Sequence, residues 1–191
     1  MISAVGRARM MTVLPPVPEE LATRGIALRP EEPEDDGFLS RLYVSLRWPE
    51  LEPAPWPEAA KLAFLREQCR FQTLHYKTHY DRAAWGIVTD SGIPVGRLYL
   101  HQTSADLRIV DISLLPSHRR QGIGSALIRA VFAQAAAAGT GVSIHVEVFN
   151  HDAQRLYERL GFVAQPNDTG VYRRMGWPSP AGRTPCRPEG A

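Results

Sequence analysis

The amino-acid sequence predicts an α/β (α+β) fold in which helices flank a mixed, mostly antiparallel central sheet. Its 191 residues, of which 44% are apolar, suffice for one domain with a sizeable core. Three strand patterns between residues 83 and 114 follow one another through connections too short for crossovers, which makes them antiparallel neighbours. The later order of helix, strand, helix and two strands adds a parallel crossover, so the sheet should be mixed.

Both ends of the chain are expected to lie outside the domain. Prolines within residues 15–18 disfavour regular structure, and residues 1–23 are therefore interpreted as a flexible leader. The ordered domain is expected over residues 24–177. Prolines among Gly, Ser and Arg then predict a disordered tail over residues 178–191.

The first half of the domain is expected to hold one strand and two helices. The strand covers residues 25–30, and acidic residues at 34–36 favour the start of a helix that includes residues 38–46. Residues 48–57 are rich in proline and predict a linker. Pro57 suits the first position of a second helix that runs to about Tyr76.

The second half alternates strands and helices. A helix that follows Gly124 should end near Gly139, and a later helix should be capped by Asn150 and stopped by Gly161. The strands are expected over residues 83–89, 94–101, 107–114 and 142–148, with a closing hairpin that turns around residues 167–170.

The chain is organised around residues 114–128. An apolar run ends at Pro116, a basic turn follows, and Gly122 and Gly124 precede a run with helical periodicity. The first amides of a helix lack intrahelical acceptors, and the helix dipole adds partial positive charge there. Because glycines let a large anion come close, this stretch is a candidate diphosphate site. The alternative is a tight strand-to-helix turn without a ligand.

Composition and motifs exclude several function classes. The formal charge of +2 does not favour binding to nucleic acid or to a membrane, and no apolar run reaches the roughly 18 residues of a bilayer span. Two cysteines, Cys69 and Cys186, cannot form a disulfide framework, which favours a cytoplasmic setting. Gly122-Ile123-Gly124 is not followed by the Lys-Ser/Thr of a nucleotide hydrolase. We expect no metal site.

Two motifs resemble the GNAT acyltransferase superfamily. The first is Leu114-Leu115-Pro116 followed by Arg119-Arg120-Gln121-Gly122-Ile123-Gly124. The second is Asn150-x-x-Ala153-x-x-Leu156-Tyr157-x-x-x-Gly161-Phe162. Together, at this separation and in this order of elements, they are far more specific than either is alone. The resemblance covers residues 25–176.

The resemblance implies direct transfer of an acetyl group from acetyl-CoA, used as a co-substrate, to an amine. It places the diphosphate on the amides of the turn, and it pairs the pantetheine arm with the edge of the preceding strand, which splays from residues 142–148. The amide of Leu114 would polarise the thioester carbonyl. The residues that the resemblance assigns to coenzyme binding are Ser113, Leu114, Leu115, Arg119, Arg120, Gln121, Gly122, Ile123, Gly124, Ser125, Asn150 and Tyr157.

Four of these residues have structural alternatives. Tyr157 matches the family tyrosine that gives a proton to the departing thiolate, and it also fits a core position on a packed helix. Asn150 matches the residue that contacts the pantetheine arm, and it also fits a plain helix N-cap. The charges of Arg119 and Arg120 suit phosphate binding, although a solvated turn accounts for them equally well.

The general base is left open by the sequence. Several family members carry a glutamate five positions before the motif asparagine, and His145 holds that position here, with Glu147 on the same strand face. The alternative is a half-buried structural histidine. Other members place the base where Arg108 stands, and Arg108 cannot serve. Asp111 is the second candidate, with a structural carboxylate as its alternative.

The acceptor is expected to be a primary amine of a small molecule or a peptide. An aromatic, weakly acidic wall built from the first two helices and their linker favours such an acceptor over a large polycation. The alternatives are acetylation of a protein N-terminus or lysine, and a GNAT-like sensor that binds acyl-CoA without turnover. A homodimer is left open.

Overall fold

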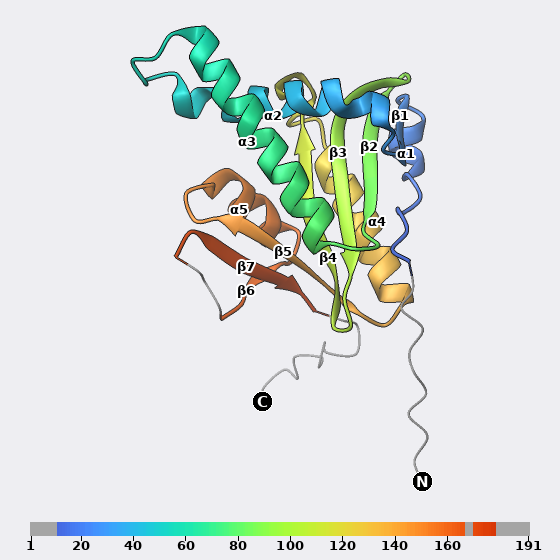
Figure 1. The fold of residues 1–191 in the computed structure, drawn as a ribbon. Coiled ribbons are helices and arrows are strands. Elements are labelled where there is room, and N and C mark those ends of the chain that lie inside the picture. The colour runs from blue at the N-terminus through green and yellow to red at the C-terminus, as the bar shows by residue number, and fades with distance from the viewer. Residues whose placement is uncertain (1–10, 167–169, 179–191) are drawn as a thin grey trace.

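The computed structural model describes residues 11–166 and 170–178, which form one sheet between two helical layers (Figure 1). The sheet has seven strands in the order β1-β2-β3-β4-β5-β7-β6. Of these pairs, β4 and β5 run parallel and the others antiparallel, which confirms the mixed, mostly antiparallel sheet. The strands are β1 (Ile26–Pro30), β2 (Ala84–Asp90), β3 (Ile93–Gln102), β4 (Asp106–Leu114), β5 (Gly141–Glu147), β6 (Val163–Ala164) and β7 (Tyr172–Trp177).

The helices cover the two faces of the sheet unequally. Behind the sheet in Figure 1 lies α4, whose apolar side packs on the strands together with Tyr157 and Phe162 in the largest core cluster. On the opposite face, α2 and α3 cover a smaller cluster around Leu42 and Tyr99. The helices are α1 (Glu19–Ala22), α2 (Asp36–Leu51), α3 (Glu58–His79), α4 (Ile123–Ala137) and α5 (His151–Arg159).

Strands β4 and β5 part at the centre of the sheet, as Figure 1 shows. Their pairing ends at Ile109 and Ile144, so the second half of β4 has no strand on that side. On its other side, β4 carries a bulge at Val110, because Tyr99 pairs with Asp111 and the next residue of β3 pairs with Ile109. The V-shaped opening between β4 and β5, which we call the splay, was expected from the family resemblance.

The second half of the expected leader, residues 12–21, packs against the domain. Leu21 is buried in α1, and Leu14 and Val17 pack against the main core. Thr12 accepts a hydrogen bond from the amide of Gln102 through its hydroxyl oxygen. Residues 11–18, which hold three prolines, form no helix or strand. Their apolar side chains still pack on the sheet.

The expected linker begins later than predicted, because α2 continues to Leu51 and carries Pro49 in its interior. A proline there removes one helical hydrogen bond. Trp48 and Leu51 compensate by packing against the cluster that joins α2 to α3. The other predicted elements lie within a few residues of their expected positions, and β6 and β7 pair as the expected hairpin.

The turn around residues 167–169 and the tail from residue 179 onward lie outside the described residues. Within the part of the chain that the structure describes, no helix is long and apolar enough to span a bilayer.

Candidate active site

The turn before α4 presents a run of unpaired backbone donors. Within the described ranges, the N–H groups of residues 120–125 donate no hydrogen bond, and the first paired amide is that of Ala126, which donates to the carbonyl of Gly122. Arg120 has a φ of 58° and Gly122 a φ of 81°, so the backbone alternates hand through this turn. A side chain on Gly122 would meet only open space, which leaves the amides accessible. We call these amides the cradle; unpaired N–H groups at a helix N-terminus are an arrangement that can hold an anion.

Arg24, which lies just before β1, contacts the cradle, and the sequence analysis missed it. Nη1 of Arg24 donates to the backbone carbonyl of Gln121 at 3.0 Å, and Nη2 approaches its side-chain oxygen at 3.4 Å. The Gln121 side chain in turn donates to the carbonyl of Ser117. Because 97 residues separate Arg24 from Gln121, no local spacing could have indicated this contact.

The edge of β4 that faces the splay has an unpaired backbone N–H at Leu114. The amide of Leu115 donates to the carbonyl of Val95 on β3, so the N–H and carbonyl of Leu114 point the other way. The carbonyl of Leu114 accepts from Nε of Arg119 at 3.0 Å. The predicted residues Ser113, Leu114 and Leu115 therefore lead from the splay to the cradle as one continuous edge.

Tyr157 of α5 is buried in the main core cluster. Its side chain is 7% exposed, and its hydroxyl has no hydrogen-bond partner within the described residues. Burial raises the pKa of this hydroxyl, and the negative charge of Asp111 raises it further. The phenol is therefore protonated at neutral pH, as a proton donor must be. Although Tyr157 and Asp111 come from different faces of the sheet, the splay brings them within electrostatic reach of each other.

Asn150 caps α5, since its side-chain oxygen accepts from the amide of Ala153 at 3.1 Å. This confirms the helix N-cap interpretation. The NH₂ group of the same side chain makes no hydrogen bond within the described residues, so it is still available to a ligand.

Asp111 lies in a buried polar cluster on the α3 face. Its carboxylate accepts from Nη2 of Arg97 at 2.6 Å, and it also accepts from the hydroxyls of Ser113 at 2.5 Å and Tyr76 at 3.2 Å. Arg97 is only 3% exposed. Both oxygens of this carboxylate are already bound by donors, one of them a buried guanidinium, so the geometry favours the structural role of Asp111.

His145 lies on the same face at the closed end of the splay. Its Nδ1 is 2.8 Å from Nη2 of Arg108, which can only donate, so Nδ1 is the acceptor. Burial lowers the pKa of His145, and the positive charges of Arg108 and Arg174 lower it further. The imidazole is therefore neutral near pH 7. Glu147, two residues on, pairs with Arg47 of α2 at 2.9 Å.

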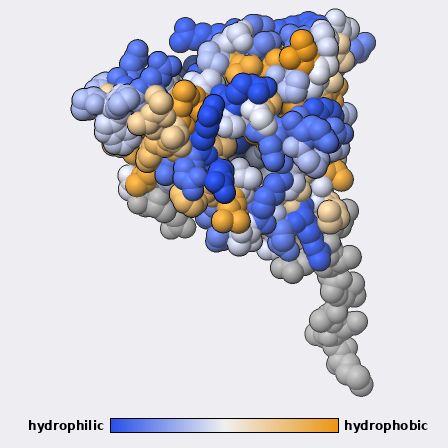
Figure 2. Space-filling view, turned by 45° about the horizontal axis from the view of Figure 1, so that its top comes forward, coloured by the Kyte–Doolittle hydropathy of each residue, from blue (hydrophilic) through white to orange (hydrophobic). Residues whose placement is uncertain are grey.

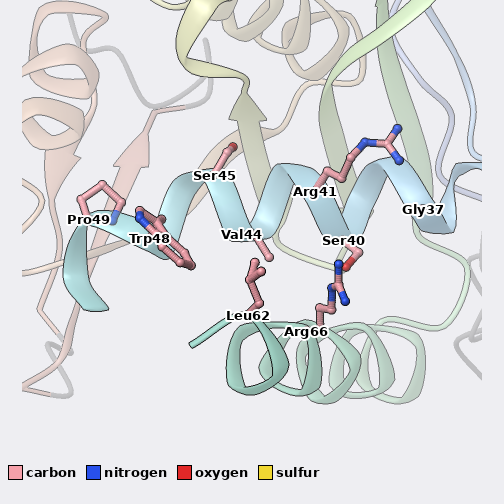
Figure 3. A pocket seen from close by; sticks show the side chains of 9 residues that line it. All are labelled: Gly37, Ser40, Arg41, Val44, Ser45, Trp48, Pro49, Leu62 and Arg66. Carbon is pink, nitrogen blue, oxygen red and sulfur yellow. The ribbon is translucent and has the colours of Figure 1, made fainter. Parts of the chain in front are cut away.

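Two cavities lie on the side of the sheet that α2 and α3 cover. One, of about 380 Å³, lies beside His145 and Arg108. The other, of about 680 Å³, is a groove between α2 and α3 in which Leu62 points toward Val44 and Trp48 (Figure 3). The groove contains none of the predicted site residues. Polar and apolar residues mix over the face drawn in Figure 2, and Trp56 and Phe71 are exposed, so the expected aromatic wall is only partly formed.

The described residues include no group of three or more His, Cys, Asp or Glu side chains that could hold a metal ion.

Comparison with known structures finds the same fold in other proteins. A PaiA N-acetyltransferase from Thermoplasma acidophilum in complex with coenzyme A is 18% identical over 80% of this chain and 98% of its own, with a TM-score of 0.61. An acetyltransferase from Thermus thermophilus is 20% identical over 80% and 96%, with a TM-score of 0.59. The ribosomal-protein-S18-alanine N-acetyltransferase from Escherichia coli is 18% identical over 81% and 94%, with a TM-score of 0.54.

These likenesses show a shared fold. At the level of sequence, no curated protein matches the chain. The family model described as the acetyltransferase (GNAT) family matches residues 44–162, which include the cradle, the splay and Tyr157. That range is more than half of the chain and holds both motifs. The chain therefore belongs to the GNAT acetyltransferase family.

Proposed function

We propose that this protein is an N-acetyltransferase that moves an acetyl group from acetyl-CoA to a primary amine of a small molecule or peptide by direct attack. One observation carries the proposal: the unpaired amides of residues 120–125 follow the end of β4, where the N–H of Leu114 is also unpaired, and the protonated phenol of Tyr157 is within electrostatic reach of Asp111 on the same strand. Diphosphate, pantetheine arm and thioester need these three features in this order.

Each residue then has a defined task. The cradle amides bind the diphosphate, with Arg119 and Arg120 exposed beside them. The backbone of β4 at Leu114, between Ser113 and Leu115, pairs with the pantetheine arm, and the free NH₂ group of Asn150 reaches the same arm. The N–H of Leu114 stabilises negative charge on the carbonyl oxygen under attack. Tyr157 gives its proton to the leaving sulfur.

Removal of the amine's proton is assigned to a water that His145 positions. His145 is neutral, but its Nδ1 accepts from Arg108, so Nε2 carries the ring proton. A water bound to this N–H can accept the amine's proton and release it to solvent, so His145 positions the water and does not itself take the proton. The carboxylate of Asp111 is not assigned this task, because Arg97 and two hydroxyls already bind it.

Release of free thiol from acetyl-CoA tests this function when each amine of a panel is added and the product mass is measured. The panel includes peptide N-termini, because one structurally similar protein is a ribosomal-protein N-acetyltransferase. We expect amine-dependent thiol release with an equal amount of N-acetylated amine. Coenzyme binding without thiol release for any amine would instead support an acyl-CoA sensor. A cytoplasmic location and a homodimer stay predictions.

A further inference from the structure

A basic cavity of about 380 Å³ opens on the α3 face where β4 and β5 stop pairing. Arg108 is one of the last paired residues of β4, and His145 is the first residue of β5 beyond that pairing. The cavity thus adjoins the closed end of the splay, opposite the end at which the cradle lies. Its walls are Thr103, Ala105, Asp106, Arg108, Ser143, His145 and Arg174.

The charges in this cavity do not balance. Nη2 of Arg174 pairs with Asp106 at 3.1 Å, and the other oxygen of Asp106 accepts from the Thr103 hydroxyl. Within the described residues Arg108 has no carboxylate partner. It donates to neutral His145 and lies 5.4 Å from the ring centre of Tyr80. One positive charge is left uncompensated in a partly enclosed site, which is unfavourable unless an anion joins it.

Two buried N–H groups of the same arginines also have no acceptor. Nε of Arg108 and Nε of Arg174 are both buried and have no hydrogen-bond partner within the described part of the chain. A buried donor without an acceptor loses its hydration and gains nothing in return. A guanidinium binds a carboxylate through adjacent N–H groups, so one carboxylate could satisfy these donors and the unpaired charge together.

The lowered pKa of His145 is consistent with an excess of positive charge in this cavity. Burial is the larger cause of its lowered pKa, and the positive charges of Arg108 and Arg174 add to it. Asp106 acts in the opposite direction but does not cancel them. The same carboxylate of Asp106 would repel a doubly charged phosphate more strongly than a singly charged carboxylate, which favours the latter as the ligand.

We propose that the acceptor amine carries a carboxylate, which Arg108 and Arg174 bind in this cavity while the amino group lies in the splay. This inference rests on the proposed function and narrows it to one substrate class, amino acids or short acidic peptides. Arg108 stands five residues before Ser113, which is roughly 16 Å along a strand. The spacing between amino group and carboxylate therefore decides which member of the class fits.

The test compares ω-amino acids from glycine to 6-aminohexanoate, and glycyl-aspartate, each with its neutral carboxamide counterpart. Thiol release from acetyl-CoA gives kcat/KM for each pair. At the best spacing we expect the carboxylate to exceed its carboxamide by about tenfold or more. Arg108→Gln keeps a donor for His145 but removes the charge, and it should bring that ratio close to one. Arg174→Gln should reduce the ratio as well.

Arg129→Gln is the matched control, because Arg129 is exposed on α4 at the other face of the sheet. It should leave the ratio unchanged. Carboxamides that react as well as their carboxylates would overturn the inference and leave N-acetyl transfer intact.

A binding measurement separates failure of the inference from failure of the proposed function. N-acetylated products of the same series are titrated into the protein while the ring resonances of His145 are followed by NMR. Saturable shifts that Arg108→Gln abolishes would support the carboxylate site even if no amine were acetylated. Absence of saturable shifts across the whole series would overturn the inference of a carboxylate site.

Discussion

Nη2 of Arg108 lies 2.8 Å from Nδ1 of His145, and this contact joins the end of the β4–β5 pairing to the start of the splay. A guanidinium is always charged and can only donate, so the contact requires an unprotonated Nδ1. Protonation of His145 would place two donors and two positive charges against each other. The contact therefore favours the neutral imidazole in the folded protein.

The pH dependence of stability should reveal this preference. Because the pKa of His145 is lowered on folding, the folded state takes up a proton less readily than the unfolded state. Its contribution is therefore fully present above the ordinary histidine pKa of about 6.5 and is lost as the pH falls below it. Urea unfolding at pH 7.5 and 5.5 should show a smaller loss on acidification in His145→Gln than in the wild type. An equal loss in both proteins would contradict the assignment.

Tyr157→Phe should separate catalysis from folding. The hydroxyl has no hydrogen-bond partner within the described residues, so we expect the free energy of unfolding to change little. Loss of the proton donor should lower kcat about 100-fold while the KM for acetyl-CoA stays near its wild-type value. A variant that kept the wild-type kcat would show that Tyr157 is a core residue only.

Gly122→Ala should impair coenzyme binding. Gly122 and Gly139 cap opposite ends of the α4 region with φ values of 81° and 67°, and an added Cβ at either would meet no atom within 4 Å. Each alanine should therefore cost about 1 kcal/mol of stability through backbone strain. Only Gly122→Ala also places a methyl group beside the cradle amides, so only this variant should raise the KM for acetyl-CoA. Equal KM values in both variants would place the diphosphate elsewhere.

Arg24→Ala should loosen the cradle, although Arg24 lies 97 positions before Gln121 in the sequence. Arg24 is exposed, and its contacts are with the backbone and side chain of Gln121. We expect the affinity for coenzyme A, measured by calorimetry, to fall severalfold while the unfolding midpoint changes little. Arg129→Ala is the control, because its charge lies on the exposed side of α4. Unchanged affinity in Arg24→Ala would mean that the turn holds its shape unaided.

Asp111→Ala should act mainly on stability. It removes one partner of a pair in which Arg97 is 3% exposed and leaves that guanidinium buried without its carboxylate. The expected loss is about 3–5 kcal/mol in urea unfolding. Asp152→Ala removes an exposed pair with Arg155 and should cost no more than about 1 kcal/mol. Similar small losses in both variants would argue against a structural role for Asp111.

Local patterns were sufficient to predict the donor side of this protein. Gly122 and Gly124 mark a helix start, and Asn150 and Tyr157 lie at a fixed spacing on the next helix. These features depend on neighbours in the chain, so the cradle, the N-cap and the order of elements could be predicted. The sequence also placed His145 and Glu147 on one face, and the structure confirms it.

The contacts on which the proposed mechanism depends connect distant parts of the chain. The pairing of Arg108 with His145 spans 37 positions and depends on where β4 and β5 separate. Docking of Leu14 and Leu21 on the sheet was missed because isolated apolar residues among prolines show no periodicity. The helix through Pro49 was missed because tertiary packing of Trp48 and Leu51 overrides the local effect of proline.

An NMR titration of the ¹⁵N-labelled protein with coenzyme A tests most directly whether the cradle and the splay hold the donor. We predict saturable shifts that are largest at the amides of residues 120–125 and at Leu114, because these N–H groups gain acceptors on binding. Saturable binding that leaves these resonances in place and moves others would contradict the account.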